Sequence, residues 1–286
     1  MRFRTETEPV RTSMRITHDT PVFMAGSCFS DNISARLVRG GFDVCANPSG
    51  TLYNPLSIEA MIHALVAERR VTEEELVECS GVWHSMDHHS SFSSRQRAAV
   101  VDKVNDSYSH GARALRGAGI MILTFGTAWI YTRAGRVVAN CHKLPAVEFD
   151  RRRLDVDEAA GAIGRAVTAA RSVNAALPVV LTVSPVRHVA DGLHGNNLSK
   201  ATLLLACDRV CRDFKDVIYF PSFEMLNDDL RDYRFYDADM KHPSSVAVDY
   251  IYERFSGTFM SDDTRRKALC AEAEWRRAAH RSLISN

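Results

Sequence analysis

Five short apolar runs, each long enough for one buried strand, are separated along this chain by stretches whose apolar residues recur at helical spacing. The expected strands are residues 22–25, 42–45, 119–125, 178–183 and 217–220. Strands that alternate with helices pair in parallel, because each crossover helix returns the chain to the same end of the sheet. The sequence therefore predicts an α/β fold, with a doubly wound, mainly parallel five-stranded sheet and helices on both faces in a three-layer sandwich.

Helical spacing marks the segments between these strands. A helix after Cys28 is closed by Gly40 and Gly41, and an acidic first turn at Thr72 predicts the opening of another helix. The segment 191–197 is expected to be a loop. The other expected helices cover residues 56–66, 94–118, 154–173 and 198–210.

Length and composition fit one globular α/β domain. The 286 residues are 45% apolar and 25% charged, which is ordinary usage for a chain with a sizeable core. We expect an extended lead-in over residues 1–20, one domain over 21–260 with a hairpin insertion at about 128–145, and a charged helical tail over 261–286. That tail is either a solvated helix or a surface for a homo-oligomer.

The charge balance argues against several classes of partner. With 36 basic and 35 acidic residues the formal charge is +1, so nothing overall favours nucleic acid or an anionic membrane. No apolar run is long enough to span a bilayer, and the N-terminus lacks a leader-like apolar region. We expect a soluble, cytoplasmic protein without a nucleic-acid partner.

The seven cysteines include no Cys-x-x-Cys pair, so neither a disulfide framework nor a zinc knuckle is expected. Cys28 is distinctive because it stands where the first strand ends at Gly26 and a helix begins. A helix N-terminus directs N–H groups and the positive end of its dipole at such a side chain, which favours the thiolate. Cys28 is therefore a candidate nucleophile, and the alternative is a small apolar core residue.

Near the other end of the chain, Asp239 stands three residues before His242. One turn would let the carboxylate hold one imidazole nitrogen while the other nitrogen faces a nucleophile. This spacing makes His242 a candidate base and Asp239 its partner.

Polar loops after the strands supply candidate substrate-binding residues. Residues 83–93 contain three histidines. We read them as lining a substrate pocket, as solvated loop histidines or, least favoured, as a metal site, because no cysteine partner accompanies them. Arg187 would hold an anionic group or form a structural ion pair. We expect no metal and no cofactor. The candidates for substrate binding are His89, Asn140, His142, Arg187 and His188.

Five motifs in order resemble the GSCFA family, which is named for the first of them, over about residues 21–256. They are Gly26-Ser27-Cys28-Phe29, the segments 123–129 and 184–188, the segment 196–201, and Asp239-Met240-Lys241-His242-Pro243-Ser244. That family is similar to the SGNH (GDSL-like) hydrolases, whose nucleophile is a serine after the first strand. The resemblance implies an SGNH-like, flavodoxin-like fold with Cys28 at the serine position, His242 as base and Asp239 as its orienting carboxylate.

The resemblance also implies an oxyanion hole, made by the Cys28 N–H, a glycine and an asparagine. Gly50 matches the glycine, but Ala128 stands near the place of the asparagine. Thr127, Asn54 or Asn140 would then have to supply the missing donor.

Two functions are compatible with these residues. The first is a hydrolase or acyltransferase with a cysteine nucleophile, acting on an ester, thioester or other acyl group of a small molecule or glycan. The second is a catalytically inactive relative that binds a carbohydrate or another small ligand in the same pocket.

Overall fold

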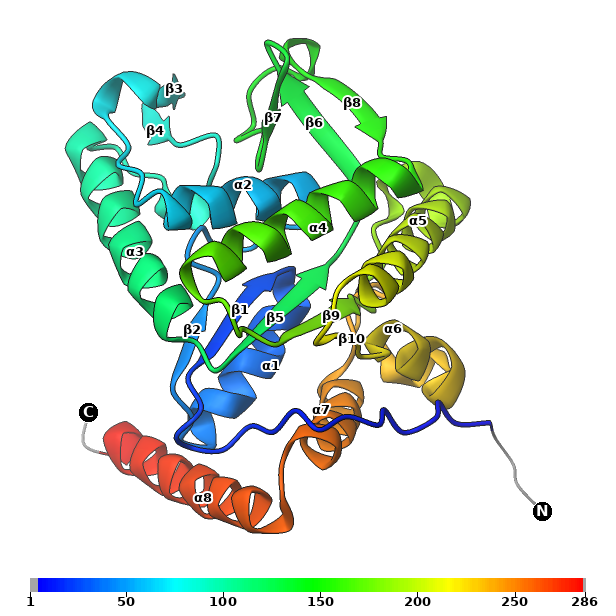
Figure 1. Ribbon diagram of the computed structural model, residues 1–286. Coiled ribbons are helices and arrows are strands. Elements are labelled where there is room, and N and C mark those ends of the chain that lie inside the picture. The colour runs from blue at the N-terminus through cyan, green and yellow to red at the C-terminus, as the bar shows by residue number, and fades with distance from the viewer. Residues whose placement is uncertain (1–4, 285–286) are drawn as a thin grey trace.

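The computed structural model describes residues 5–284, with side chains up to residue 279. Five parallel strands form the central sheet in the order β10-β9-β5-β1-β2 (Figure 1). Numbered along the chain this is the order 2-1-3-4-5, the flavodoxin-like doubly wound arrangement. The predicted fold class is confirmed. The strands are β1 (Val22–Gly26), β2 (Val44–Ala46), β5 (Ile120–Phe125), β9 (Val179–Val183) and β10 (Val217–Tyr219).

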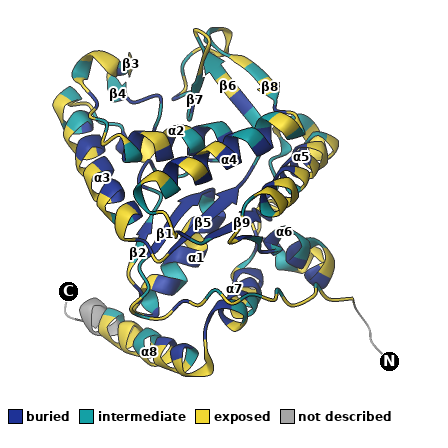
Figure 2. Cartoon of the chain, viewed as in Figure 1, coloured by how far each residue is buried: buried dark blue, intermediate teal, exposed yellow. Residues whose placement is uncertain are grey.

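Helices cover both faces of this sheet. Because successive side chains of a strand point to opposite faces, Phe23 and Leu123 join the core on one side, and Met24 and Ile122 join the core on the other. Every residue of β1, β5 and β9 is buried (Figure 2). The first core is completed by α2 (Pro55–Val66), α3 (Arg97–Gly117), α4 (Val156–Val173) and α5 (Gly192–Asp213), and the second by α1 (Cys28–Arg39) and α7 (Ser245–Phe259).

The last helix, α8 (Asp262–Ile284), lies outside α1 (Figure 1). Ala268 of this helix is buried in the second core, and Glu272 pairs with Arg36 of α1 at 3.6 Å. The Arg39 guanidinium lies 4.8 Å from the ring centre of Trp275. The inner side of the tail is therefore bound to the domain. No helix in the described part of the chain is both long and apolar enough to span a membrane.

A second, antiparallel sheet stands beyond the end of β5, at the top of Figure 1. The predicted hairpin is formed by β6 (Trp129–Arg133) and β7 (Arg136–Val138), and β8 (Asp150–Arg153) pairs with the other side of β6. The strand β8 was not predicted, because its residues, one aspartate and three arginines, have no apolar face.

Two further predictions about elements were wrong. The helix expected from Thr72 is a single 3₁₀ turn, Glu73–Glu75, followed by the hairpin β3 (Val77–Cys79) and β4 (Val82–His84). The loop expected at 191–197 belongs largely to α5, which begins at Gly192. The remaining short elements are α6 (Ser222–Glu224), a π turn at Met225–Leu230 and 3₁₀ turns at Ser90–Phe92, Ala146–Glu148, Val189–Asp191 and Tyr233–Phe235.

Candidate active site

The turn between β1 and α1 places Cys28 at the carboxyl edge of the sheet. Gly26 has φ +148°, and a Cβ there would lie 2.1 Å from the carbonyl oxygen of Thr124 on β5. The Gly26 N–H donates to Asn47 Oδ1 at 2.8 Å, and the Ser27 N–H donates to Thr124 O at 3.1 Å. Cys28 is then the first residue of α1, at the point where the sheet order reverses between β2 and β5.

The electrostatic surroundings of Cys28 differ from the expected ones. Burial and the carboxylate of Asp31 raise the pKa of the thiol, and the opposing N–H groups of Cys28 and Phe29 and the charge of Lys200 only partly offset them. The N–H groups at the helix N-terminus favour the thiolate as expected, but desolvation of the sulfur is the larger effect, so the net shift of the Cys28 pKa is upward. A reaction at this thiol needs a base.

Asp239 and His242 form the hydrogen-bonded pair that their spacing predicts. Asp239 Oδ2 accepts from His242 Nδ1 at 2.6 Å, and Oδ1 accepts from the N–H groups of Lys241 and His242, both at 2.9 Å. The backbone N–H and the imidazole of His242, with the Lys241 N–H, hold the pKa of Asp239 well below its usual range. An ionised carboxylate thus fixes Nδ1 as the protonated nitrogen and leaves Nε2 to accept a proton.

His188 and Tyr53 lie between these two parts of the site. A Cβ on Gly126 would be 3.0 Å from His188 Nε2, 3.2 Å from the Tyr53 ring and 3.3 Å from the Cβ of Ser27. The two rings meet edge to face at 5.4 Å. Tyr53 interacts electrostatically with Cys28, and His188 with His242. Residues from both ends of the chain therefore converge here.

His188 is a neutral imidazole in this site. Burial, Lys200 and His242 lower its pKa to about 3. Its backbone N–H donates to Asn196 Oδ1 at 2.9 Å, which fixes the loop, while the buried Nε2 has no hydrogen-bond partner in the described part of the chain. That nitrogen is a polar group for which a substrate atom would be a partner.

Three of the expected oxyanion donors, Gly50, Asn54 and Thr127, are engaged elsewhere. The Gly50 N–H donates to Asn47 O at 2.7 Å, and the side chain of Asn54 caps α2 through Ser57. The N–H of Thr127 donates to Tyr53 O at 2.9 Å, and its hydroxyl is 3.0 Å from Ser199 Oγ. These bonds leave the Cys28 N–H as the expected donor that still faces the sulfur.

The expected substrate-binding residues divide into two groups. His89 interacts with Asp31, and Arg187 stacks on Tyr236 at 4.0 Å while its N–H holds Lys241 O at 3.1 Å, so both adjoin the site. His142 does not, because it is 5% exposed and its ring is stacked on His84.

Asn140 accepts from the His142 N–H at 2.9 Å and belongs with it. His142 Nε2 donates to Ser85 O at 2.8 Å, and His88 Nδ1 is 2.7 Å from Ser85 Oγ. The histidine-rich segment is thus a buried structural cluster. Within the described residues, no three His, Cys, Asp or Glu side chains are placed to hold a metal ion.

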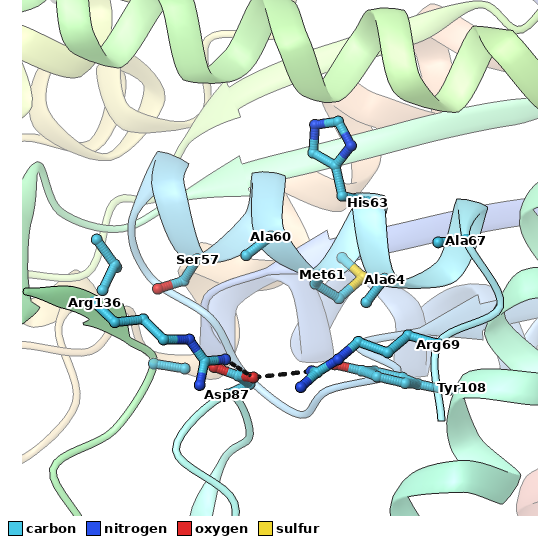
Figure 3. A pocket seen from close by; sticks show the side chains of 12 residues that line it. Ser57, Ala60, Met61, His63, Ala64, Ala67, Arg69, Asp87, Tyr108 and Arg136 are labelled. Atoms are coloured by element: carbon cyan, nitrogen blue, oxygen red, sulfur yellow. Dashed lines mark hydrogen bonds and ion pairs between the residues drawn. The ribbon is translucent and has the colours of Figure 1, made fainter. Parts of the chain in front are cut away.

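A pocket of about 430 Å³ lies between α2 and β7 (Figure 3). Arg136 and Val137 of the β6–β7 hairpin form one wall of it. Arg69 and Arg136 both bind Asp87, so its charged groups are already paired. None of the candidate catalytic residues lines this pocket, and we do not assign the chemistry to it.

Fold and site together define a class: a doubly wound α/β protein with a cysteine at the first strand-to-helix turn and an Asp-x-x-His pair at the last loop. A model of the GSCFA family matches residues 21–255. The chain belongs to the GSCFA family.

None of the curated proteins compared with the chain matches it. Among solved structures it is similar to a family 3 carbohydrate esterase from Talaromyces cellulolyticus, with 8% identity and a TM-score of 0.39 over 83% of this chain and 95% of that one. The family 3 carbohydrate esterase of Clostridium thermocellum gives the same identity, TM-score and share of this chain, with 94% of its own length covered. Likeness at this level carries no argument about activity.

Proposed function

We propose that the protein is a hydrolase or acyltransferase that uses Cys28 as nucleophile, His242 as general base and Asp239 as its orienting carboxylate. The observation that carries the proposal is that Cys28 acts on the Tyr53 ring and His242 acts on the His188 ring, and that these two rings contact each other at 5.4 Å. A small-molecule or glycan acyl compound is the proposed substrate, and the cytoplasm the proposed location.

The raised pKa of Cys28 dictates the order of the proton transfers. As the sulfur attacks the acyl carbon, His242 Nε2 takes the thiol proton, and the developing oxyanion is held by the N–H of Cys28. The leaving alcohol or thiol then takes that proton from His242, which leaves an acyl-Cys28 thioester. Water or an acceptor hydroxyl or amine attacks this thioester and gives its proton to His242. The carbon–sulfur bond then breaks, the acid or the acylated acceptor is released, and His242 returns the proton to the Cys28 sulfur.

The test is intact mass after exposure to a panel of acyl thioesters and aryl esters. We expect one acyl adduct on the wild type, none on Cys28→Ala, and slower adduct formation by roughly a hundredfold or more in His242→Ala. Asp239→Asn should slow it less, because the imidazole remains but its orientation and tautomer are no longer fixed. Equal adduct formation in wild type and His242→Ala would overturn the proposal.

A second candidate is a protein that binds an acylated or sugar-like ligand without turnover. It is favoured by Ala128, which is fully buried and offers no side-chain donor where an asparagine is expected. This candidate function predicts that Cys28→Ala does not change ligand affinity. It also predicts that His242→Ala does not change the alkylation rate of Cys28.

A further inference from the structure

Lys200 of α5 is buried near the turn that carries the candidate nucleophile, and the proposed chemistry does not use it. Only 1% of its surface is exposed. Its Nζ donates to Gly126 O at 2.6 Å and to Ser184 O at 2.7 Å. These carbonyls belong to the residues that follow β5 and β9, so one ammonium ties two adjacent strand ends together.

The hydrogen bond from Lys200 to Gly126, the residue after β5, links Lys200 to the Cys28 turn. Gly126, whose carbonyl Lys200 holds, lies against Ser27, because a Cβ on it would be 3.3 Å from the Ser27 Cβ. The Gly126 N–H in turn donates to Tyr53 O at 2.7 Å. The position of Lys200 therefore affects the residue before Cys28 and the ring that faces it.

The Lys200 ammonium group also has few partners that would compensate its charge. An ammonium carries three N–H donors, and two acceptors are found for it in the described part of the chain, both of them neutral carbonyls. The aromatic contact is the ring of Phe223, 5.9 Å away. Its interactions with titratable groups are those with Cys28 and with the neutral His188. Burial lowers the pKa of Lys200 to about 7, and Cys28 opposes that shift.

A buried ammonium without a carboxylate partner is unfavourable, and an apolar residue of the same length would fill this space more easily. The group that would compensate it is a thiolate on Cys28. Facing Cys28, the other charged or titratable groups are Asp31 from its own helix, Tyr53 from the loop after β2, and His242 in the proposed reaction.

We propose that Lys200 is a positioning residue of the Cys28 site, which holds the turns after β5 and β9 in place and stabilises the thiolate by its charge. This inference rests on the proposed function, in which Cys28 reacts as a thiolate at its attack on the acyl group. Lys200 acts on the sulfur and makes no contact with the substrate.

The experiment is the rate of Cys28 alkylation by iodoacetamide between pH 6 and 10, followed by peptide mass spectrometry. Lys200→Met removes the charge and the hydrogen bonds, whereas Lys200→Gln removes the charge and keeps amide donors. At pH 6 to 6.5, where Lys200 is protonated, both should slow Cys28 by about tenfold, with the pH profile shifted upward. Lys215→Met, a matched change of an exposed lysine just beyond α5, should leave the rate unchanged. The exposed thiol of Cys270 is the internal reference in every variant.

A structural role alone would lower the melting temperature without shifting the pH profile, and that result in Lys200→Gln would overturn the proposal. If Lys200 affects the ionisation of Cys28, then Cys28 must affect the ionisation of Lys200 by the same amount. A second measurement therefore keeps Lys200 and changes Cys28. In Cys28→Ser, Lys200 should lose its proton at lower pH than in the wild type, as read from its side-chain NMR signals. An unchanged titration would also contradict the proposal.

The two proposals fail separately. If alkylation depends on His242 but not on Lys200, the catalytic assignment stands and the role of Lys200 is wrong. If it depends on Lys200 while no acyl adduct forms on any substrate, the coupling stands and the catalytic assignment falls.

Discussion

Gly26 is the residue at which the backbone most narrowly limits the side chain. Its φ of +148° and the 2.1 Å approach to Thr124 O leave no space for a Cβ. We expect Gly26→Ala to lower the free energy of unfolding by about 3 kcal/mol or more. Gly117→Ala is the matched control, because a Cβ at the end of α3 meets nothing within 4 Å, and it should be neutral or slightly stabilising. Urea unfolding of the two variants measures both effects, and equal midpoints would contradict this account of the turn.

Asp31 is the charged residue that most directly opposes a thiolate on Cys28. Asp31→Asn removes the negative charge and keeps an oxygen that can accept from Asn47 Nδ2, now 2.5 Å from it. We expect Cys28 alkylation at pH 7.5 and low salt to become about two- to fivefold faster.

Asp43→Asn provides the control for Asp31→Asn, since Asp43 acts on the thiol of Cys45. It should leave the Cys28 rate unchanged. A slower Cys28 in Asp31→Asn would show that the carboxylate orders the turn instead of opposing the thiolate.

At the residue scale, the sequence predicted those interactions that form between residues close together along the chain. Asp239 and His242 are three residues apart, and they form the predicted pair. The pKa of Cys28 could not be read from its helix position, because burial by residues far along the chain outweighs the local N–H groups. Tyr53 and Lys200 were missed for the same reason. Lys200 had one local signal, a lysine followed by the apolar stretch 201–206 of an expected helix.

At the scale of elements, Asn54 is a helix cap. Its Oδ1 accepts from the Ser57 N–H at 2.9 Å at the start of α2, and Pro55 occupies the first turn. We expect Asn54→Ala to cost about 1 kcal/mol of stability, and Asn54→Asp, which keeps the accepting oxygen, to cost little. Asn54→Asp also lacks the amide N–H donor. If a stable Asn54→Asp variant no longer forms the acyl adduct, the original prediction that Asn54 is an oxyanion donor would be supported.

Most elements of the main sheet were predictable, and the reason is physical. Parallel strands covered on both faces must be apolar throughout, so β1, β5 and β9 appear as uninterrupted runs. The strand β8 and the first turns of α5 carry no such signal. Asp150–Arg153 is charged at every position, and Gly192 to Asn197 contains two glycines and two asparagines, which are poor helix formers.

At the scale of the molecule, the topology explains how positions 28 and 242 serve one site. All five strands run in the same direction, so the turns that follow them meet at one edge, and Lys200 ties two of these turns together. The Asp239–His242 loop is attached to the same edge by the Arg187 N–H. The sequence predicted that the site lies at the carboxyl edge of the sheet. It did not predict that Lys200 and the Arg187 N–H fix the loops at this edge.

Three histidines with strongly lowered pKa values make the stability of the whole molecule depend on pH. Burial lowers the pKa values of His88 and His142 to about 4 and that of His188 to about 3. In the unfolded chain these side chains titrate near 6.5, so below that pH the unfolded state binds more protons than the folded state. The contribution of these three histidines to stability should therefore be constant above about pH 7 and fall as the pH drops through 6.5 toward 4.

By linkage each such histidine removes about 1 kcal/mol at pH 5.5, where carboxylates still contribute little. Urea unfolding at pH 7.5 and pH 5.5 measures the sum, which we expect to be about 3 kcal/mol. His142→Gln should reduce this difference by about one third whatever its stability at pH 7.5, whereas His63→Gln, at a histidine with 54% of its side chain exposed, should leave the difference unchanged. Equal stability of the wild type at the two pH values would mean that the histidine cluster and His188 are protonated in the folded protein. His188 would then be an imidazolium beside His242, and the neutral imidazole described for this site would be wrong.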